Sequence, residues 1–446
     1  MADSLIHSED LKAVFYKFSQ IGMELGLELS KLSYSLDMSD WIEDGWFDIS
    51  IKIRNKIYGG IASFEEKNRL RSAFYNTLVP KIAKASSDNI ITAGKQLSTL
   101  IDDPYSTERG RSVVLVKRLS SKKYVIAIGF AGTGKNFLSW LSNFGFEHDD
   151  GLHAGFNRIA EEFIADAESI NFSTVAKELG LKKISLKDIF ISIKSPDSPF
   201  KVFLAGHSQG AAVLQIMALK LTLEGAYHKN ITAYGFAPPS TALNSFSVPQ
   251  IPVYLVANQD DVFAKTGLEK HIGNYYLYKN SKEMREQCYG ERLNNPLFKN
   301  IIDNLNSIQT TDEALLLFIA FMYALSYLPK EELNRASDEM GGIWKLPFLP
   351  DETPFNSTLL MRSFFRNRYK VLTGQEPDTK KLLPLALEEY KIIKRHGAVN
   401  VFNTAVAAIR ATHSLHVKSE EKLLSCYAYI LKSGFNELIQ VKIKSI

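Results

Sequence analysis

The chain has 446 residues, with 53 basic and 49 acidic side chains and a formal net charge of +4. This length predicts either one large α/β domain with insertions or two domains. The near balance of charge, without an arginine-rich tract, argues against a nucleic-acid partner, and only two cysteines, Cys288 and Cys426, argue against a disulfide framework, although the two could still pair.

The first ten residues contain no basic segment followed by an apolar core, which argues against a Sec-type signal peptide. We therefore expect a cytoplasmic protein or one exported by another route. The most apolar stretch, Ala314–Leu328, is shorter than the about 20 residues that a helix needs to cross a bilayer. We expect no transmembrane helix, and a buried helix is favoured here over a lipid-facing one.

Short apolar runs alternate with helical patterns through the middle of the chain, which predicts an α/β protein with a largely parallel sheet. Residues from about 10 to 100 and from about 280 to 446 are expected to be mostly helical, the second region being interrupted by a loop at Gly341–Pro354. The expected central elements are strands at Ser112–Lys117, Tyr124–Gly129, Val202–Ala205, Ile231–Phe236 and Val253–Ala257, and a helix at Gly155–Ser169.

The turn Gly206–Gly210, Gly-His-Ser-Gln-Gly, lies between a buried strand and an apolar helix. A serine on so sharp a turn is held in a strained conformation, and the flanking glycines avoid clashes with neighbouring elements. Ser208 is therefore the candidate nucleophile, with an ordinary glycine-rich turn as the alternative. Because the helix begins directly after Ser208, the amide of Gln209 is a candidate oxyanion donor.

The loop Gly129–Asn136 has two interpretations. Its spacing comes close to that of a phosphate-binding loop, but Asn136 stands where a serine or threonine hydroxyl reaches magnesium. The favoured interpretation is an oxyanion loop at Phe130–Thr133, in which the amide and hydroxyl of Thr133 face the substrate carbonyl beside the Gln209 amide.

Six segments, in order over residues 110–280, resemble those of class 3 lipases, the family that includes fungal triacylglycerol lipases. The resemblance implies an α/β-hydrolase fold with a central, mostly parallel sheet and a Ser-His-Asp triad. The chain departs from the family pattern at Ala131, where the family has arginine, and at Gln209, where leucine is common. The segments are Phe130–Thr133, Trp140–Asn143, His153–Phe156, Gly206–Gly210, Tyr234–Pro239 and Asn258–Val262.

A serine nucleophile needs a histidine to take its proton and a carboxylate to orient that histidine. Asp260 follows the expected strand Val253–Ala257 and lies in the segment that resembles the acid-bearing stretch of the family. We predict Asp260 as this carboxylate, with Asp261 as the alternative. A third interpretation makes both of them ordinary turn carboxylates.

The catalytic histidine of the family comes late in the chain, in a short stretch that Thr412–His416 resembles. We therefore predict His413 as the base, with His271, His416 and His396 as alternatives. Because His413 lies much farther beyond Asp260 than in compact family members, a helical insertion must fold back to present it. The remaining histidines have other expected places: His7 in an exposed terminus, His207 pointing away from the nucleophile, His148 and His153 in a lid or structural role, and His228 facing solvent.

Three regions are expected: an N-terminal helical segment, 1–105; a hydrolase core, 106–280; and a mainly helical region, 281–446, that completes the acyl pocket and supplies the histidine. The basic stretch Arg362–Lys370 is a candidate for contact with anionic headgroups, with a solvated face as the alternative. The candidate lid within 136–150, which alternatively is simple aromatic packing, contains Phe137, Trp140, Leu141, Phe144 and Phe146.

Together these features predict a carboxylic-ester hydrolase of lipase or phospholipase type that acts through an acyl-enzyme. We expect a lipid ester as substrate, peripheral contact with a membrane surface, and no cofactor or metal. Two alternatives belong to other classes. One is a catalytically inactive lipase-like module whose C-terminal helices bind a protein partner, and the other is a P-loop nucleotide enzyme.

Overall fold

A computed structural model describes most of the central α/β region and of the C-terminal half. The described residues are 14–15, 17–35, 39–49, 112–120, 122–133, 143, 146, 148–170, 172, 179–181, 184–329, 331–333, 354–415, 423–433 and 438–441. Several predictions lie outside them: those on His7, Asn136, Phe137, Trp140, Leu141, Phe144, His416, most of the segment 1–105 and nearly all of the loop Gly341–Pro354.

A mixed, mostly parallel sheet forms the centre of the molecule, in the strand order β1-β2-β3-β6-β7-β8-β9-β10. Strands β3, β6, β7, β8 and β9 are parallel, whereas β1, β2 and β10 pair antiparallel. The predicted α/β fold with a central parallel sheet is therefore confirmed. The strands are β1 Phe47–Asp48, β2 Ser112–Ser120, β3 Lys123–Phe130, β6 Phe200–His207, β7 Ile231–Phe236, β8 Val253–Asn258, β9 Asn274–Tyr278 and β10 Leu438–Val441.

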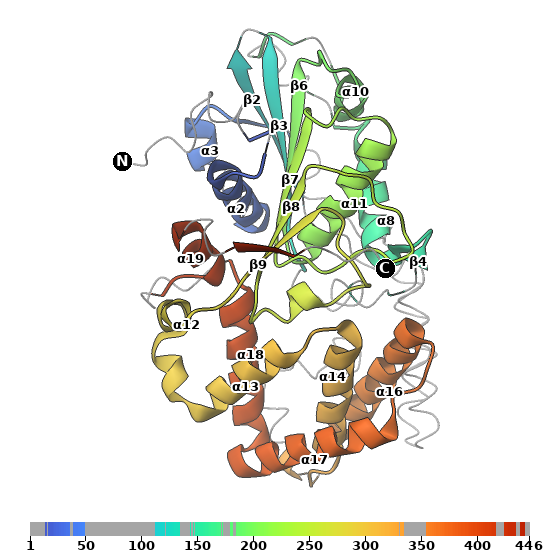
Figure 1. Cartoon of the computed structure of the whole chain (residues 1–446), viewed down its shortest axis with the longest axis vertical. Helices are drawn as coiled ribbons and strands as arrows, with labels where there is room; N and C mark the ends of the chain where they lie inside the picture. Colours follow the sequence, from blue (N-terminus) through green and yellow to red (C-terminus); the bar gives the residue numbers. More distant parts are fainter. Residues whose placement is uncertain are drawn as a thin grey trace.

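Helices cover both faces of this sheet (Figure 1). One face packs against α8 (Ala154–Asp166), α10 (Leu186–Ser192) and α11 (Gln209–Leu223) through one large apolar cluster. The opposite face packs against α2 (Gln20–Ser35) and α19 (Cys426–Ser433) through a second cluster. Because helices bury both faces, the inner strands are nearly continuous apolar runs, as the sequence indicated.

A helical region lies beyond the carboxyl ends of the parallel strands (Figure 1). A third apolar cluster there is built mainly from α14, α16 and α17. The stretch Ala314–Leu328 falls largely in α14, where Leu315, Ile319 and Ala320 are buried in this cluster. The helices of the region are α12 Lys282–Tyr289, α13 Pro296–Ser307, α14 Thr311–Ser326, α16 Pro354–Thr373, α17 Thr379–His396 and α18 Ala398–His413.

Helix α18 connects this helical region to the sheet. Ala398 and Val401, near its start, are buried in the helical cluster, whereas Ala408, near its end, is buried in the cluster beneath α2 and α19. Apolar contacts at both ends therefore fix where α18 ends. The chain then returns through α19 to β10, which pairs with β9 at the edge of the sheet.

The remaining short elements lie in the connections. They are α3 Ser39–Glu43, the hairpin β4 His148–Asp149 with β5 Leu152–His153, and the 3₁₀ helices Phe263–Lys265 and Gly290–Asn294. In the described part of the chain, no helix combines the length and the apolarity that a bilayer crossing requires.

Candidate active site

Ser208 occupies a strained turn between β6 and α11. Its φ of 56° and ψ of −125° lie in a region that residues with a Cβ rarely adopt. The conformation is held because the Ser208 amide donates to the carbonyl of Phe236 on β7 at 2.9 Å, while its own carbonyl accepts from the first turn of α11. The sequence prediction that this turn projects a serine at the end of an inner strand therefore agrees with the backbone geometry.

The loop that follows β3 packs directly against this turn. A Cβ built on Gly132 would lie 3.0 Å from Ser208 Cβ and 2.8 Å from the His207 carbonyl oxygen, and it would overlap the Tyr34 hydroxyl. Only glycine allows so close an approach. Thr133, the predicted oxyanion residue, directly follows this glycine in the chain.

Asn143 joins the two predicted oxyanion residues to each other. Its side-chain NH₂ donates to Thr133 Oγ1 at 2.9 Å, and its Oδ1 accepts from Gln209 Nε2 at 3.1 Å. Since Thr133 Oγ1 accepts from Asn143, its own hydroxyl hydrogen must point elsewhere. Gln209 is the first residue of α11, so its amide is one of those at the helix N-terminus that no carbonyl of the helix accepts.

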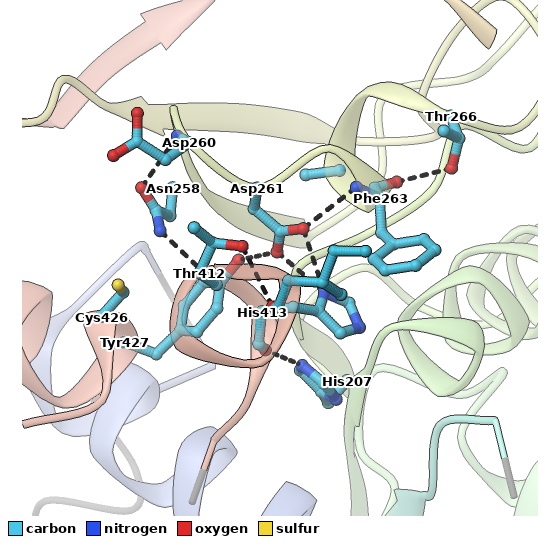
Figure 2. Close-up of polar contacts among 12 residues, drawn as sticks. His207, Asn258, Asp260, Asp261, Phe263, Thr266, Thr412, His413, Cys426 and Tyr427 are labelled. Carbon is cyan, nitrogen blue, oxygen red and sulfur yellow. Dashed lines mark hydrogen bonds and ion pairs between the residues drawn. The ribbon is translucent and has the colours of Figure 1, made fainter. Parts of the chain in front are cut away.

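His413, the last residue of α18, is paired with Asp261. Its Nδ1 lies 2.9 Å from Asp261 Oδ2 and 3.1 Å from Oδ1 (Figure 2). A carboxylate only accepts, so Nδ1 carries the hydrogen and the neutral ring keeps a basic Nε2. Asp261 also accepts from the Tyr427 hydroxyl at 2.8 Å and from the Phe263 amide at 3.0 Å.

The predicted carboxylate, Asp260, is bound elsewhere, which corrects the choice between the two neighbouring aspartates. Arg285 donates to both of its oxygens, from Nη2 at 2.7 Å and from Nε at 3.0 Å, and the Tyr289 hydroxyl donates at 2.9 Å. The two carboxylates therefore leave the turn after β8 in different directions: Asp260 toward α12, and Asp261 toward His413.

Side chains from three different elements cap the C-terminus of α18. The last carbonyls of a helix have no partner within it, so external donors fix its end. Three such hydrogen bonds dock α18 onto the end of β8, onto the Ser208 turn and onto α19. They explain how a helix far along the chain places its last residue, His413, beside Asp261. They run from Cys426 Sγ to Ala411 O (3.3 Å), from Asn258 Nδ2 to Thr412 O (3.0 Å) and from His207 Nε2 to His413 O (2.8 Å).

His207 also connects α18 to the N-terminal helix α2. Because the His413 carbonyl only accepts, His207 Nε2 carries the hydrogen, and in the neutral ring Nδ1 accepts from the Tyr34 hydroxyl at 2.7 Å. Burial raises the pKa of Tyr34, so its hydroxyl keeps this proton, while the Gly132 amide donates to the same oxygen. One continuous chain of hydrogen bonds thus joins the oxyanion loop, α2, the Ser208 turn and α18.

The structure brings the Ser208 turn and His413 close together through His207. The rings of His207 and His413 lie 4.6 Å apart, and His413 also contacts Phe263 at 4.6 Å. Among the described residues, no hydrogen bond joins Ser208 Oγ to His413. Such bonds are often long in unliganded enzymes and tighten when substrate binds.

The other described histidines lie away from this pair. His271 stacks on Tyr275 at 4.2 Å, and burial lowers its pKa to about 4. His153 stacks on Phe156 at 3.9 Å, and burial lowers its pKa to about 3, so its ring stays neutral. His148 and His228 are exposed, and His396 ends α17. His207 was expected to point away from the nucleophile, and in the structure its ring contacts His413, the predicted base.

Three residues of the site were missed from the sequence: Tyr34, Asn143 and Tyr427. Asn143 belongs to the Trp-x-x-Asn segment that carried part of the resemblance, so a signal for it was present. Tyr34 and Tyr427 come from opposite ends of the chain and from helices without a motif, so no local pattern indicated them. Of the candidate lid residues, Phe146 is described, and it is buried in the helical cluster.

Comparison with known families agrees with this geometry. Residues 127–270 match the family model of the class 3 lipases. The predicted resemblance to class 3 lipases is confirmed over this segment. The segment contains the Ser208 turn, Thr133 and Asp261, whereas Tyr34, His413 and Tyr427 lie outside it. A search of curated protein sequences found no match.

Three solved structures show a partial likeness, each with a TM-score of 0.27. The lipase from Rhizopus microsporus var. chinensis is 20% identical over 39% of this chain and 58% of its own. The Rhizomucor miehei lipase propeptide complex is 18% identical over 38% of this chain and 53% of its own. A third, described as a triacylglycerol lipase with a serine protease triad, is 19% identical over 39% and 63%. The chain thus spans less than two thirds of each enzyme.

Proposed function

We propose that this protein hydrolyses carboxylic esters of lipids through an acyl-enzyme formed on Ser208. The observation that carries the proposal is the His413–Asp261 pair, which α18 delivers beside the strained serine turn. The match to class 3 lipases supports a lipid ester as the substrate class.

In the proposed first step, Ser208 Oγ attacks the acyl carbonyl carbon while His413 Nε2 accepts the hydroxyl proton. Asp261 holds His413 in the tautomer with a basic Nε2 and stabilises the imidazolium that forms. The negative charge that develops on the carbonyl oxygen is stabilised by the Thr133 hydroxyl and amide and by the Gln209 amide. His413 then returns the proton to the leaving alkoxide, and the alcohol departs.

In the second step, His413 takes a proton from water, and the resulting hydroxide attacks the acyl-enzyme carbonyl. Collapse of the second tetrahedral intermediate releases the fatty acid, and His413 returns the proton to Ser208 Oγ. Asn143 and the Tyr34–His207 pair do not react. They hold Thr133, the Ser208 turn and the end of α18 in fixed positions relative to one another through both steps, since each links two of these parts.

The experiment measures hydrolysis of soluble nitrophenyl esters, emulsified triacylglycerol and phospholipid by the full chain and by Ser208→Ala. The proposal predicts ester hydrolysis that falls by about 10⁴-fold or more in the variant, with an unchanged melting temperature. Full activity in Ser208→Ala would place the chemistry elsewhere. If no ester of any class is hydrolysed, the protein is a binding module.

A further inference from the structure

Helix α17 has two apolar faces, and in the part of the chain that the structure describes only one of them packs against the rest of the protein. Leu382, Ala386 and Ile393 are buried in the helical cluster against α14. On the other side, Leu383 and Leu387 are exposed, at 49% and 56%. Exposed single leucines are common, but two of them on adjacent turns of one helix form a surface feature.

The exposed leucines belong to a stripe along the outside of α17, which we call the α17 outer stripe. Its members are spaced i, i+3, i+4, i+7, i+11 and i+14, which places them on one face of a helix. All six are exposed: Lys380, Leu383, Pro384, Leu387, Lys391 and Lys394. The stripe therefore has an apolar centre with lysines at both ends.

The charge around this stripe is mainly positive. On α17 itself, the acidic residues are Glu388 and Glu389, which lie off the stripe, against three lysines on it. Glu388 is 3.5 Å from Lys391, and Glu332 is 3.3 Å from Lys394. These exposed pairs are weak and leave the lysines accessible.

Exposed tyrosine lies at the same edge. Tyr327, at the end of α14, is 61% exposed and meets Tyr390 of α17 edge to face at 6.2 Å, and Lys394 lies over the Tyr390 ring. Leucine, tyrosine and lysine side by side on one helix face are the composition of helices that lie in a membrane interface.

We propose that the α17 outer stripe docks on an anionic lipid surface, with Leu383 and Leu387 among the acyl chains and Lys380, Lys391 and Lys394 at the headgroups. Figure 1 shows α17 along the edge of the helical region farthest from the sheet, so the stripe is separate from the Ser208 site. The proposal goes beyond the hydrolase reaction, since it assigns a surface and a partner that the reaction does not require.

A second copy of the chain is a poorer fit to this surface. Two stripes packed together would bring lysines against lysines, and like charges in contact oppose association. Two leucines and a proline also cover far less than the roughly 800 Å² of total surface that each partner buries in a stable protein interface. An acidic lipid surface satisfies both the charge and the small apolar centre.

The test is flotation of the full chain, in a Ser208→Ala background that leaves the lipid intact, with phosphatidylcholine vesicles and with vesicles that also contain phosphatidylglycerol. We expect binding to the anionic vesicles that falls as salt is added. Leu383→Ser with Leu387→Ser should reduce the association constant about tenfold or more. The matched control is Leu223→Ser at the end of α11, where the leucine is 66% exposed and should not matter.

The electrostatic half of the proposal has its own pair of variants. Lys380→Gln with Lys391→Gln should lower binding to anionic vesicles by about fivefold per lysine, whereas Lys282→Gln, at a side chain 90% exposed on α12, should not. Binding that is absent in the unsubstituted chain, or equally strong in stripe and control variants, overturns the proposal. So does a concentration-dependent dimer that the leucine variants abolish. Hydrolysis of a soluble ester by the wild-type chain is measured separately, so a failure of docking is distinguishable from a failure of catalysis.

Discussion

The two sides of the candidate site are held by different kinds of structure. On the nucleophile side, Thr133 and Ser208 follow the neighbouring parallel strands β3 and β6, and each is positioned by a short turn. On the base side, His413 arrives at the end of α18, from outside the family segment, and is fixed by long-range hydrogen bonds. The nucleophile side is therefore a property of the sheet, whereas the base side depends on how the C-terminal helices dock. Variants that change only one side therefore measure how much each side contributes to activity.

The largest expected effect on the base side is from His413→Ala. We expect kcat/KM for a soluble ester to fall by about 10⁴-fold or more, because the serine then has no group to accept its proton. His271→Phe is the control, since it keeps the stacking on Tyr275 and removes a ring that burial keeps neutral. Near-normal activity in His413→Ala with loss in His271→Phe would reverse the assignment.

The next effect distinguishes the two aspartates. Asp261→Asn should lower kcat by about 10³- to 10⁴-fold with little change in melting temperature, because the amide cannot hold His413 in the active tautomer. Asp260→Asn should mainly lower the melting temperature, since it weakens a buried pair with Arg285. Steady-state kinetics and thermal unfolding of both variants measure this difference. A large kcat loss confined to Asp260→Asn would restore Asp260 as the orienting carboxylate.

A smaller effect is expected where the two sides are joined. Tyr34→Phe removes the hydroxyl between Gly132 and His207. We expect kcat to fall about tenfold, because the Ser208 turn and the end of α18 are then held less firmly in position relative to each other. Tyr124→Phe is the control: it removes a buried hydroxyl bonded to Leu179 O, far from the site. An equal loss in both variants would mean a general effect on stability.

The smallest effect concerns the stability of the helical region. Burial, with Glu388 nearby, raises the pKa of Glu389 to about 7, above its ordinary value of 4.5. The stability that the protonated form contributes is present below pH 4.5 and is lost as the pH rises through about 7. Glu389→Gln, which mimics that form, should therefore raise the free energy of unfolding at pH 8 by on the order of 2 kcal/mol and change little at pH 4. Thermal unfolding at both pH values measures this. An equal gain in the free energy of unfolding from Glu283→Gln, at an exposed side chain of α12, would contradict the assignment of this effect to Glu389.

The contrast between the two sides also explains what could be predicted from the sequence. The inner strands and the Ser208 turn are local patterns, so apolar runs and glycines were sufficient to predict them. The choice between Asp260 and Asp261 depends on Arg285, Tyr289 and Tyr427, which only tertiary folding brings to the turn after β8. The prediction of His413 came from the resemblance to a known family and not from a pattern within α18. The catalytic role of His413, like that of Ser208, stays a prediction.

The most direct test of the central claim is labelling with a fluorophosphonate probe, followed by mass spectrometry of the labelled peptide. The account predicts modification of Ser208 in the wild-type chain, much slower modification in His413→Ala and Asp261→Asn, and none in Ser208→Ala. Rapid labelling of Ser208 that neither His413→Ala nor Asp261→Asn slows would contradict the assigned base side. No labelling of Ser208 in the wild-type chain would contradict the site as a whole.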